Sequence, residues 1–345
     1  MDTTMISVAA ARAVGPATAV DPELAVTRAA GNEQWLDTLA AGGRPREQAV
    51  ERLHALLLRV ARAELGRRSN QHALTGPELD DLAHQAAADA VLAILGKLDQ
   101  FRGESRFTTW AYRFAVLEVS TKLGRHFWHR HPASVLEADD WDRLPDRFGM
   151  RPDEHAQHVE LVTAVREAVQ TALTERQRSV FLALVVNAVP LDAVVAQTGS
   201  TRNAIYKTMF DARRKLRAAL AANGYVDGPD VARQPSHGKG GTRQGDRGEA
   251  AMTGWAELEQ FLRTDPADVG CDQALQMLHV YTELVRDPSL GPSAADRTGA
   301  ARARYPGVAA HLAACGPCGD DFEGLLAAVQ AEARGELPAE PEGTP

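Results

Sequence analysis

The sequence predicts an all-α protein with two helical domains and a small helical metal-binding module. Three observations support this fold class. Apolar residues recur at helical spacing in 45–131, a helix-turn-helix pattern lies in 159–222, and helical segments surround the cysteines of 253–335. The chain of 345 residues is long enough for two or three domains of ordinary size.

The other segments are expected to flank or connect these domains. Residues 1–44 are rich in Ala, Gly and Thr, 132–158 combines three prolines with several acids, and 223–252 is low-complexity Gly, Pro, Gln and Arg. We therefore expect a disordered N-terminal extension, an acidic linker and a flexible linker, and after residue 335 a disordered tail, 336–345.

The distribution of charge favours local contacts with nucleic acid. A net charge of −8 argues against a protein that coats DNA with its whole surface. However, segment 99–130 has six Arg and Lys residues against three acids, and segment 200–217 has six against Asp211 alone. Two basic patches in an acidic molecule are typical of a protein whose other surfaces meet other partners.

Composition also indicates the compartment. No run approaches the ~20 apolar residues that a membrane span requires, and the N-terminus lacks a basic leader followed by a sustained apolar block. We expect a cytoplasmic protein without membrane association. Three cysteines are too few for a disulfide framework here, and an odd number in a reducing compartment indicates thiol or metal chemistry.

Three helices are expected in the first domain. The first follows Pro45, the second opens at Thr75-Gly-Pro and is rich in alanine, and the third runs through Phe101 to Arg130. In the third, one stripe at about 100° per residue must be buried, namely Phe107, Trp110, Phe114, Leu117 and Thr121.

Tyr112 falls on the opposite face of this third helix, among cations and hydroxyls. An exposed ring beside cations suits single-stranded nucleic acid, because bases stack on rings and phosphates pair with Arg and Lys. The residues expected to meet single-stranded DNA are Arg106, Tyr112, Arg113 and Lys122. The alternative is that these charges form a solvated face.

The second domain has the clearest supersecondary signal. Thr174 and Gln177 predict a capping box, and a helix that starts after Pro190 stops at Gly199 before another begins at Ser200-Thr-Arg. In that last helix Ile205, Met209, Ala212 and Leu216 are expected to be core.

The outward face of that last helix is polar and basic. Residues at the start of a recognition helix reach base edges in the major groove, and Arg and Asn can bond a base bidentately. The residues expected to read duplex DNA are Thr201, Arg202, Asn203, Tyr206, Lys207 and Arg213. The alternative is a helical hairpin that binds nothing.

All three cysteines lie in the third module. His311 and Cys315 share a helical face at i, i+4, a turn can bring Cys318 to the same point, and Cys271 can supply a fourth ligand. A closed Cys₃His site is typical of structural zinc. The alternatives are a redox pair of Cys315 and Cys318, and His279 as the fourth ligand. The apolar positions of 322–329 predict an amphipathic helix that closes the module's own core or docks on a partner.

Several of these motifs resemble those of bacterial RNA polymerase sigma factors of the extracytoplasmic-function (ECF) group. The resemblance covers about 48–131 (region 2) and 160–222 (region 4). It rests on Asp80-Asp81-Leu82, on the highly specific stretch FRGESRFTTWAYRFA from Phe101, and on Ala212-Arg-Arg-Lys-Leu. The third module resembles the zinc-binding anti-sigma domain, through Cys271, His311, Cys315 and Cys318.

The resemblance implies a transcription initiation factor that binds core RNA polymerase and directs promoter recognition and DNA melting. Region 2 would melt and read the downstream promoter element, and region 4 would read the upstream one. The polymerase would be contacted by Asp80, Asp81, Leu82 and Gln85. Anti-sigma domains usually belong to a separate protein, so we hypothesise that this fused copy modulates its own sigma domains, by masking them through intramolecular contact or by responding to zinc, redox state or another partner.

Other functions remain open at this stage. We expect no enzymatic activity, because the sequence has no paired-carboxylate, nucleophile or P-loop constellation. One alternative is a helix-turn-helix repressor or activator with a zinc-stabilised sensor domain, which would need no strand-melting surface near Tyr112. Another is a protein-interaction regulator in which both basic patches are solvated.

Overall fold

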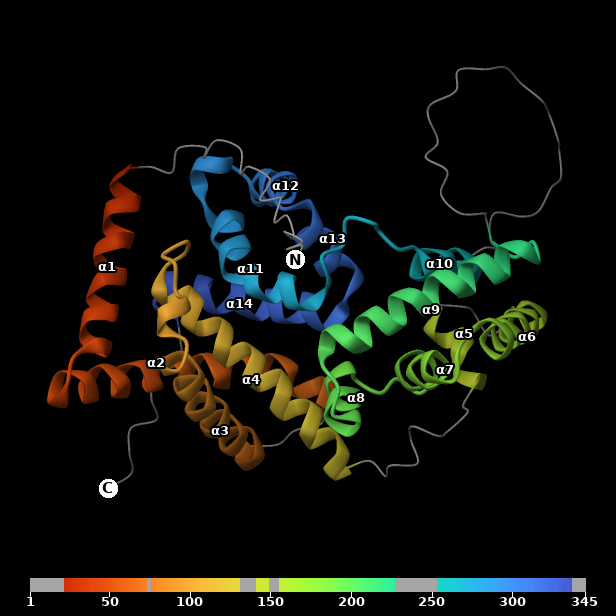
Figure 1. Ribbon diagram of the computed structural model, residues 1–345, viewed down its shortest axis with the longest axis horizontal. Coiled ribbons are helices and arrows are strands. Elements are labelled where there is room, and N and C mark those ends of the chain that lie inside the picture. The colour runs from red at the N-terminus through yellow and green to blue at the C-terminus, as the bar shows by residue number, and fades with distance from the viewer. Residues whose placement is uncertain (1–21, 73–75, 131–140, 149–154, 227–252, 337–345) are drawn as a thin grey trace, which may run out of the picture.

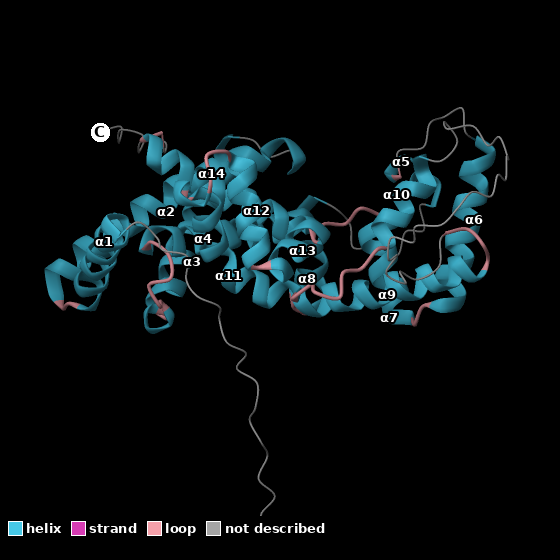
Figure 2. Ribbon diagram, turned by 90° about the horizontal axis from the view of Figure 1, so that it is seen from above, coloured by secondary structure: helices cyan, strands magenta, loops and turns pink. Residues whose placement is uncertain are grey.

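The computed structural model describes residues 22–72, 76–130, 141–148, 155–226 and 253–336, and every regular element in these ranges is a helix (Figures 1 and 2). The all-α prediction is confirmed for the described residues. The α-helices are α1 Pro22–Ala40, α2 Gly43–His72, α3 Gly76–Leu95, α4 Phe107–Arg130, α5 Leu144–Arg147, α6 His155–Ala172, α7 Glu175–Phe181, α8 Leu191–Thr198, α9 Arg202–Ala222, α10 Thr253–Leu262, α11 Gly270–Arg286, α12 Ala294–Arg304, α13 Pro306–Ala314 and α14 Gly316–Arg334.

Helices α2, α3 and α4 pack around one apolar core. Small side chains of α3 let its neighbours approach closely, and the buried ones are Ala83, Ala86, Ala87 and Ala90. Phe107, Trp110 and Phe114 are buried as predicted, and the ring of Trp110 lies 4.8 Å from that of Phe114. Leu117 and Thr121, expected in the same stripe, are only half-buried.

The expectation of disorder throughout 1–44 is wrong for α1 (Pro22–Ala40). The ring of Trp35 stacks on Phe107 with centroids 5.3 Å apart. The Asn32 amide nitrogen donates to the Ser105 carbonyl at 3.0 Å, and its oxygen accepts from the Phe107 backbone nitrogen at 2.7 Å. Because α1 satisfies a backbone donor at the start of α4, tertiary contact stabilises a segment whose composition alone indicates disorder. Residues 1–21 lie outside the described part.

The middle of the acidic segment 132–158, residues 141–148, is also not a simple linker. Trp141, Leu144 and Phe148 are buried against α6 in the core of the second domain. Prolines and acids dominate the composition of this segment, so its three large apolar side chains were not recognised as core residues. Residues 131–140 and 149–154 are not described.

Helices α7, α8 and α9 follow the predicted pattern. The capping box at Thr174 and Gln177 forms in both directions. Gly199 ends α8 with φ +60°, a backbone conformation that glycine adopts without strain. The predicted core side chains of α9 are all buried: Ile205, Met209, Ala212 and Leu216. Helix α10 completes this core with Leu258 and Leu262.

Helix α8 lies directly against α4. A Cβ on Gly124 would lie 2.6 Å from the Asp192 carbonyl carbon, so this approach requires glycine. The Trp128 indole nitrogen donates to the Ala193 carbonyl at 2.7 Å. The two domains that carry the basic patches are therefore in contact.

Helices α11 to α14 pack against both of these domains (Figure 1). Helix α14 crosses α4 and reaches α2, and α11 contacts α4 and α9. Leu325 and Val329 of α14 belong to the core of the first domain, whereas Phe322 and Leu326 pack on the module's own cluster around Tyr281. The amphipathic stretch 322–329 thus closes the module's own core, as one of its two expected roles, and also packs on the first domain of the same chain. Of the linker 223–252 and the tail 336–345, residues 227–252 and 337–345 lie outside the described part.

Candidate metal centre and nucleic-acid-binding faces

The four predicted metal ligands come together between three helices. Cys271 lies in the first turn of α11, His311 in the last turn of α13, and Cys315 and Cys318 around the start of α14. All four are buried, and one possible ligand atom from each lies within 4.8 Å of the others. The Cys315 backbone nitrogen donates to the His311 carbonyl at 2.8 Å, which holds the two side chains on one side of the turn.

The donor set fits a metal ion. Nδ1 of His311 lies 2.8 Å from Oδ1 of Asp268, whereas its buried Nε2 has no hydrogen-bond partner among the described residues. Carboxylates commonly orient metal-binding imidazoles in this way and leave the second nitrogen for the ion. Hydrogen bonds among the three thiols lower the pKa of Cys315 and raise the pKa of Cys271 and of Cys318, so a thiolate is stabilised first at Cys315.

His279, the rival fourth ligand, lies elsewhere. It is buried on α11, where the Arg113 guanidinium donates to its Nδ1 at 3.2 Å. Burial and this neighbouring cation lower the pKa of His279 to about 3. His279 therefore belongs to the contact between α11 and α4.

The predicted exposed ring on α4 is covered, so that expectation is wrong for this structure. Tyr112 does lie opposite the apolar stripe, but it is fully buried and its hydroxyl donates to Oε1 of Glu332 on α14 at 2.8 Å. Arg106 pairs with Glu283 of α11 at 3.1 Å and lies 3.8 Å from Glu332. Burial and the Glu332 carboxylate raise the pKa of Tyr112. The side chains that cover Tyr112 belong to other helices, so the periodicity of α4 alone cannot predict its burial.

Arg113 and Lys122, the other expected DNA contacts on α4, also have partners. Arg113 donates to the carbonyls of Leu275 and Gln276 on α11, at 3.2 and 2.9 Å. Burial lowers its pKa to about 10. Lys122 pairs with Asp89 of α3, inside its own domain. The module therefore occupies Arg106, Tyr112 and Arg113, but not Lys122.

The outward face of α9 is occupied by the same module. Arg202 pairs with Asp321 of α14 at 2.5 Å, and Asn203 donates to Asp272 of α11 at 2.6 Å. The Tyr206 hydroxyl donates to Asp268.

The remaining residues predicted to contact DNA from α9 form no hydrogen bond or ion pair with the described residues of the module. The Arg213 guanidinium lies over the Phe261 ring of α10, 4.3 Å from its centroid. Thr201 caps α9 through the Ala204 backbone nitrogen at 3.1 Å, and both Thr201 and Lys207 are exposed.

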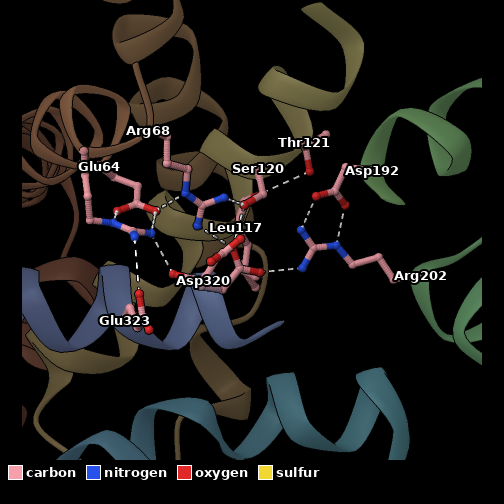
Figure 3. A network of polar contacts seen from close by, with 11 residues as sticks. Glu64, Arg68, Leu117, Ser120, Thr121, Asp192, Arg202, Asp320 and Glu323 are labelled. Carbon is pink, nitrogen blue, oxygen red and sulfur yellow. Dashed lines mark hydrogen bonds and ion pairs between the residues drawn. The ribbon is translucent and has the colours of Figure 1, made fainter. Parts of the chain in front are cut away.

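Asp321 connects the module to both domains at once. Its carboxylate, fully buried, accepts from Arg68 of α2 at 2.9 Å and from Ser120 of α4 at 2.5 Å, in addition to Arg202. Arg202 is in turn held by Asp192 of α8 at 2.5 and 2.6 Å. Figure 3 shows Arg68 and Ser120 on one side of this network and the Asp192–Arg202 pair on the other.

The predicted polymerase-binding residues on α3 remain accessible. Asp80, Asp81 and Gln85 are exposed and Leu82 is half-buried. Asp80 pairs with Arg62 of α2 at 2.8 Å. Leu92, which is 69% exposed, lies on the same face as Asp81 because eleven positions are just over three helical turns.

The acidic side chains that bind the predicted DNA-contacting residues were not predicted from the sequence. These are Asp268, Asp272, Glu283, Asp321 and Glu332. A signal for them was present, since acids flank the cysteine cluster while both basic patches lie in the other domains.

Comparison of the chain with protein-family models, with curated proteins and with solved structures finds no match. Among the described helices, none is long and apolar enough to cross a membrane.

Proposed function

We propose that this chain is a sigma-type transcription initiation factor whose own C-terminal module holds it in a closed state. The observation that carries the proposal is that one module, α11 to α14, pairs with the predicted DNA-contacting residues of two separate domains. On α4, Arg106 and Tyr112 contact carboxylates of the module. On α9, Arg202 contacts another carboxylate of the module. Phosphates and bases would compete for the same cations, so the module and promoter DNA exclude each other.

The uncovered surface supports the same function. Asp81, Gln85 and Leu92 on α3 stay open to a large partner while the DNA-facing residues are paired. The closed chain would therefore still bind core RNA polymerase, and opening would be required at the step of promoter recognition.

The Cys₃His cluster is proposed to hold structural zinc. Three sulfurs and one imidazole match the ligands that zinc takes in closed tetrahedral sites, with no position left for substrate. When bound, zinc would join α13 to α11 and α14, the two helices that carry Asp272, Glu283, Asp321 and Glu332.

Run-off transcription with purified core polymerase on genomic fragments tests the proposal. Three proteins are compared: the full chain, the full chain with Asp321→Asn and Glu332→Gln, and a chain that ends at Arg263, which keeps α10 in the core of the second domain. We expect specific initiation that is strongest from the two altered proteins. If none of the three directs specific initiation although the chain ending at Arg263 binds duplex DNA, the protein is instead a helix-turn-helix regulator with a zinc-stabilised sensor.

A further inference from the structure

Asp268 links the candidate metal centre to helix α9. One carboxylate oxygen, Oδ1, lies 2.8 Å from Nδ1 of His311, and the other, Oδ2, accepts the hydrogen bond of the Tyr206 hydroxyl. Oδ1 also accepts from the Gly270 backbone nitrogen at 2.8 Å, which fixes the carboxylate beside the cluster. A single buried carboxylate thus touches both a metal ligand and a side chain of another domain.

The Tyr206 ring also encloses the cluster. It is 6% exposed and packs with Cys271, Cys315 and Cys318. Its centroid lies 4.6 Å from that of His311, with the planes at 70°. Tyr206 therefore keeps water from the sulfurs with its ring and holds the histidine's partner with its hydroxyl.

The backbone beside the cluster is shaped for the same contact. Gly270 has φ +75°, and a Cβ at this position would lie 2.7 Å from Oδ1 of Asn203 on α9. Gly270, directly before the ligand Cys271, thus lets α9 approach. Asp272, directly after that ligand, accepts a hydrogen bond from the Asn203 amide. Docking of α9 and the geometry of the cluster share these few residues.

We propose that Tyr206 is an outer-sphere residue of the metal site, so that the module holds its metal more tightly when α9 is docked on it. Hydrogen-bond partners of metal-binding histidines commonly alter metal affinity by about 10- to 100-fold. By linkage, bound metal strengthens the docking of α9 by the same factor. This inference rests on the proposed metal site, but does not require that the chain act in transcription.

Metal release from the full-length protein measures this coupling. Zinc-loaded protein is mixed with a chromophoric chelator, and the release rate of Tyr206→Phe, which keeps the ring, is compared with wild type. Tyr225→Phe is the matched control, since that ring stacks on Trp255 instead. We expect roughly tenfold faster release for Tyr206→Phe and an unchanged rate for Tyr225→Phe.

A second variant tests the docking directly. Asn203→Ala removes the bond to Asp272 without changing any residue that touches the cluster, and we expect it to accelerate release as well. Cobalt(II) absorption of each protein reports whether the ligand set is intact. Tetrahedral cobalt spectra with wild-type release rates in both variants would overturn the coupling alone. Absence of a cobalt spectrum in the wild type would overturn the metal site itself, and the coupling with it.

Discussion

Asp321 of α14 and Arg202 of α9 form an ion pair away from solvent, with Oδ2 and Nη1 2.5 Å apart, although the two residues are 119 positions apart in sequence. The same carboxylate pairs with Arg68. Although burial raises the pKa of Asp321, Arg202 and Arg68 outweigh it and hold that pKa below its usual value. Because the carboxylate stays charged, it can hold cations of two domains against one helix of the module.

Replacing this carboxylate is expected to open the molecule. Asp321→Asn leaves Arg68 and Arg202 buried with less compensation, and breaking a buried pair costs about 3–5 kcal/mol. We expect a lower free energy of unfolding in urea and a gain in salt-dependent binding of duplex DNA. Asp320→Asn is the control, because Asp320 receives Arg67 through its backbone carbonyl. Equal stability of the two variants would contradict the role given to Asp321.

Acid is expected to weaken the contact between α11 and α4 through His279. Its folded-state pKa of about 3 lies below the ordinary 6.5. The unfolded chain therefore binds more protons between these values, and stability present above pH 6.5 is lost as the pH falls toward 3. At pH 5 the loss amounts to about 2 kcal/mol.

The comparison for this pH effect is His279→Asn, which cannot take up a proton but keeps an acceptor for Arg113. Urea unfolding of both proteins at pH 7.5 and 5.0 isolates the histidine, because the metal-binding groups titrate in both. The wild type should lose more stability than the variant. A parallel loss in the two proteins would assign the acid sensitivity to other groups.

Removal of a metal ligand is expected to dismantle the module. Cys318 is buried at the start of α14, and structural zinc contributes on the order of 10 kcal/mol to small zinc domains. Cys318→Ser should lose bound zinc and lower the midpoint of thermal unfolding. His279→Asn should retain one zinc per chain, as measured by elemental analysis. Loss of zinc from the His279 variant would instead support His279 as a ligand.

Periodicity within single helices predicted much of the fold. Phe107 and Trp110 on α4 and Ile205 and Met209 on α9 are buried as their spacing indicated, because each pattern depends on neighbours one turn away. The spacing of His311, Cys315 and Cys318 predicted the metal cluster for the same reason.

Contacts across long sequence separations could not be predicted in this way. The spacing places Tyr112 opposite the stripe correctly, but the bond to Glu332 spans 220 residues, so the exposure expected for the ring was wrong. Helix α1 was missed because Asn32 and Trp35 are stabilised by the start of α4, some 70 residues later. In both cases the decisive partner belongs to another element.

The open face of α3 leads to a prediction that separates polymerase binding from DNA binding. Full-length protein should bind core RNA polymerase without promoter DNA, because Asp81, Gln85 and Leu92 are not covered. Leu92→Asp places a charge where an apolar contact is expected, and loss of such a contact costs about 1–2 kcal/mol, or roughly tenfold in affinity. Biolayer interferometry with immobilised core polymerase measures the change.

The control for this prediction is Val159→Asp on α6, because Val159 is also an exposed apolar residue, 54% accessible, in a different domain. Its affinity for polymerase should equal that of the wild type. If both substitutions weaken binding equally, the effect is one of charge and not of the α3 face. If the chain ending at Arg263 binds polymerase and the full chain does not, the module must act already at polymerase binding, because closure then hides more than the residues that face DNA.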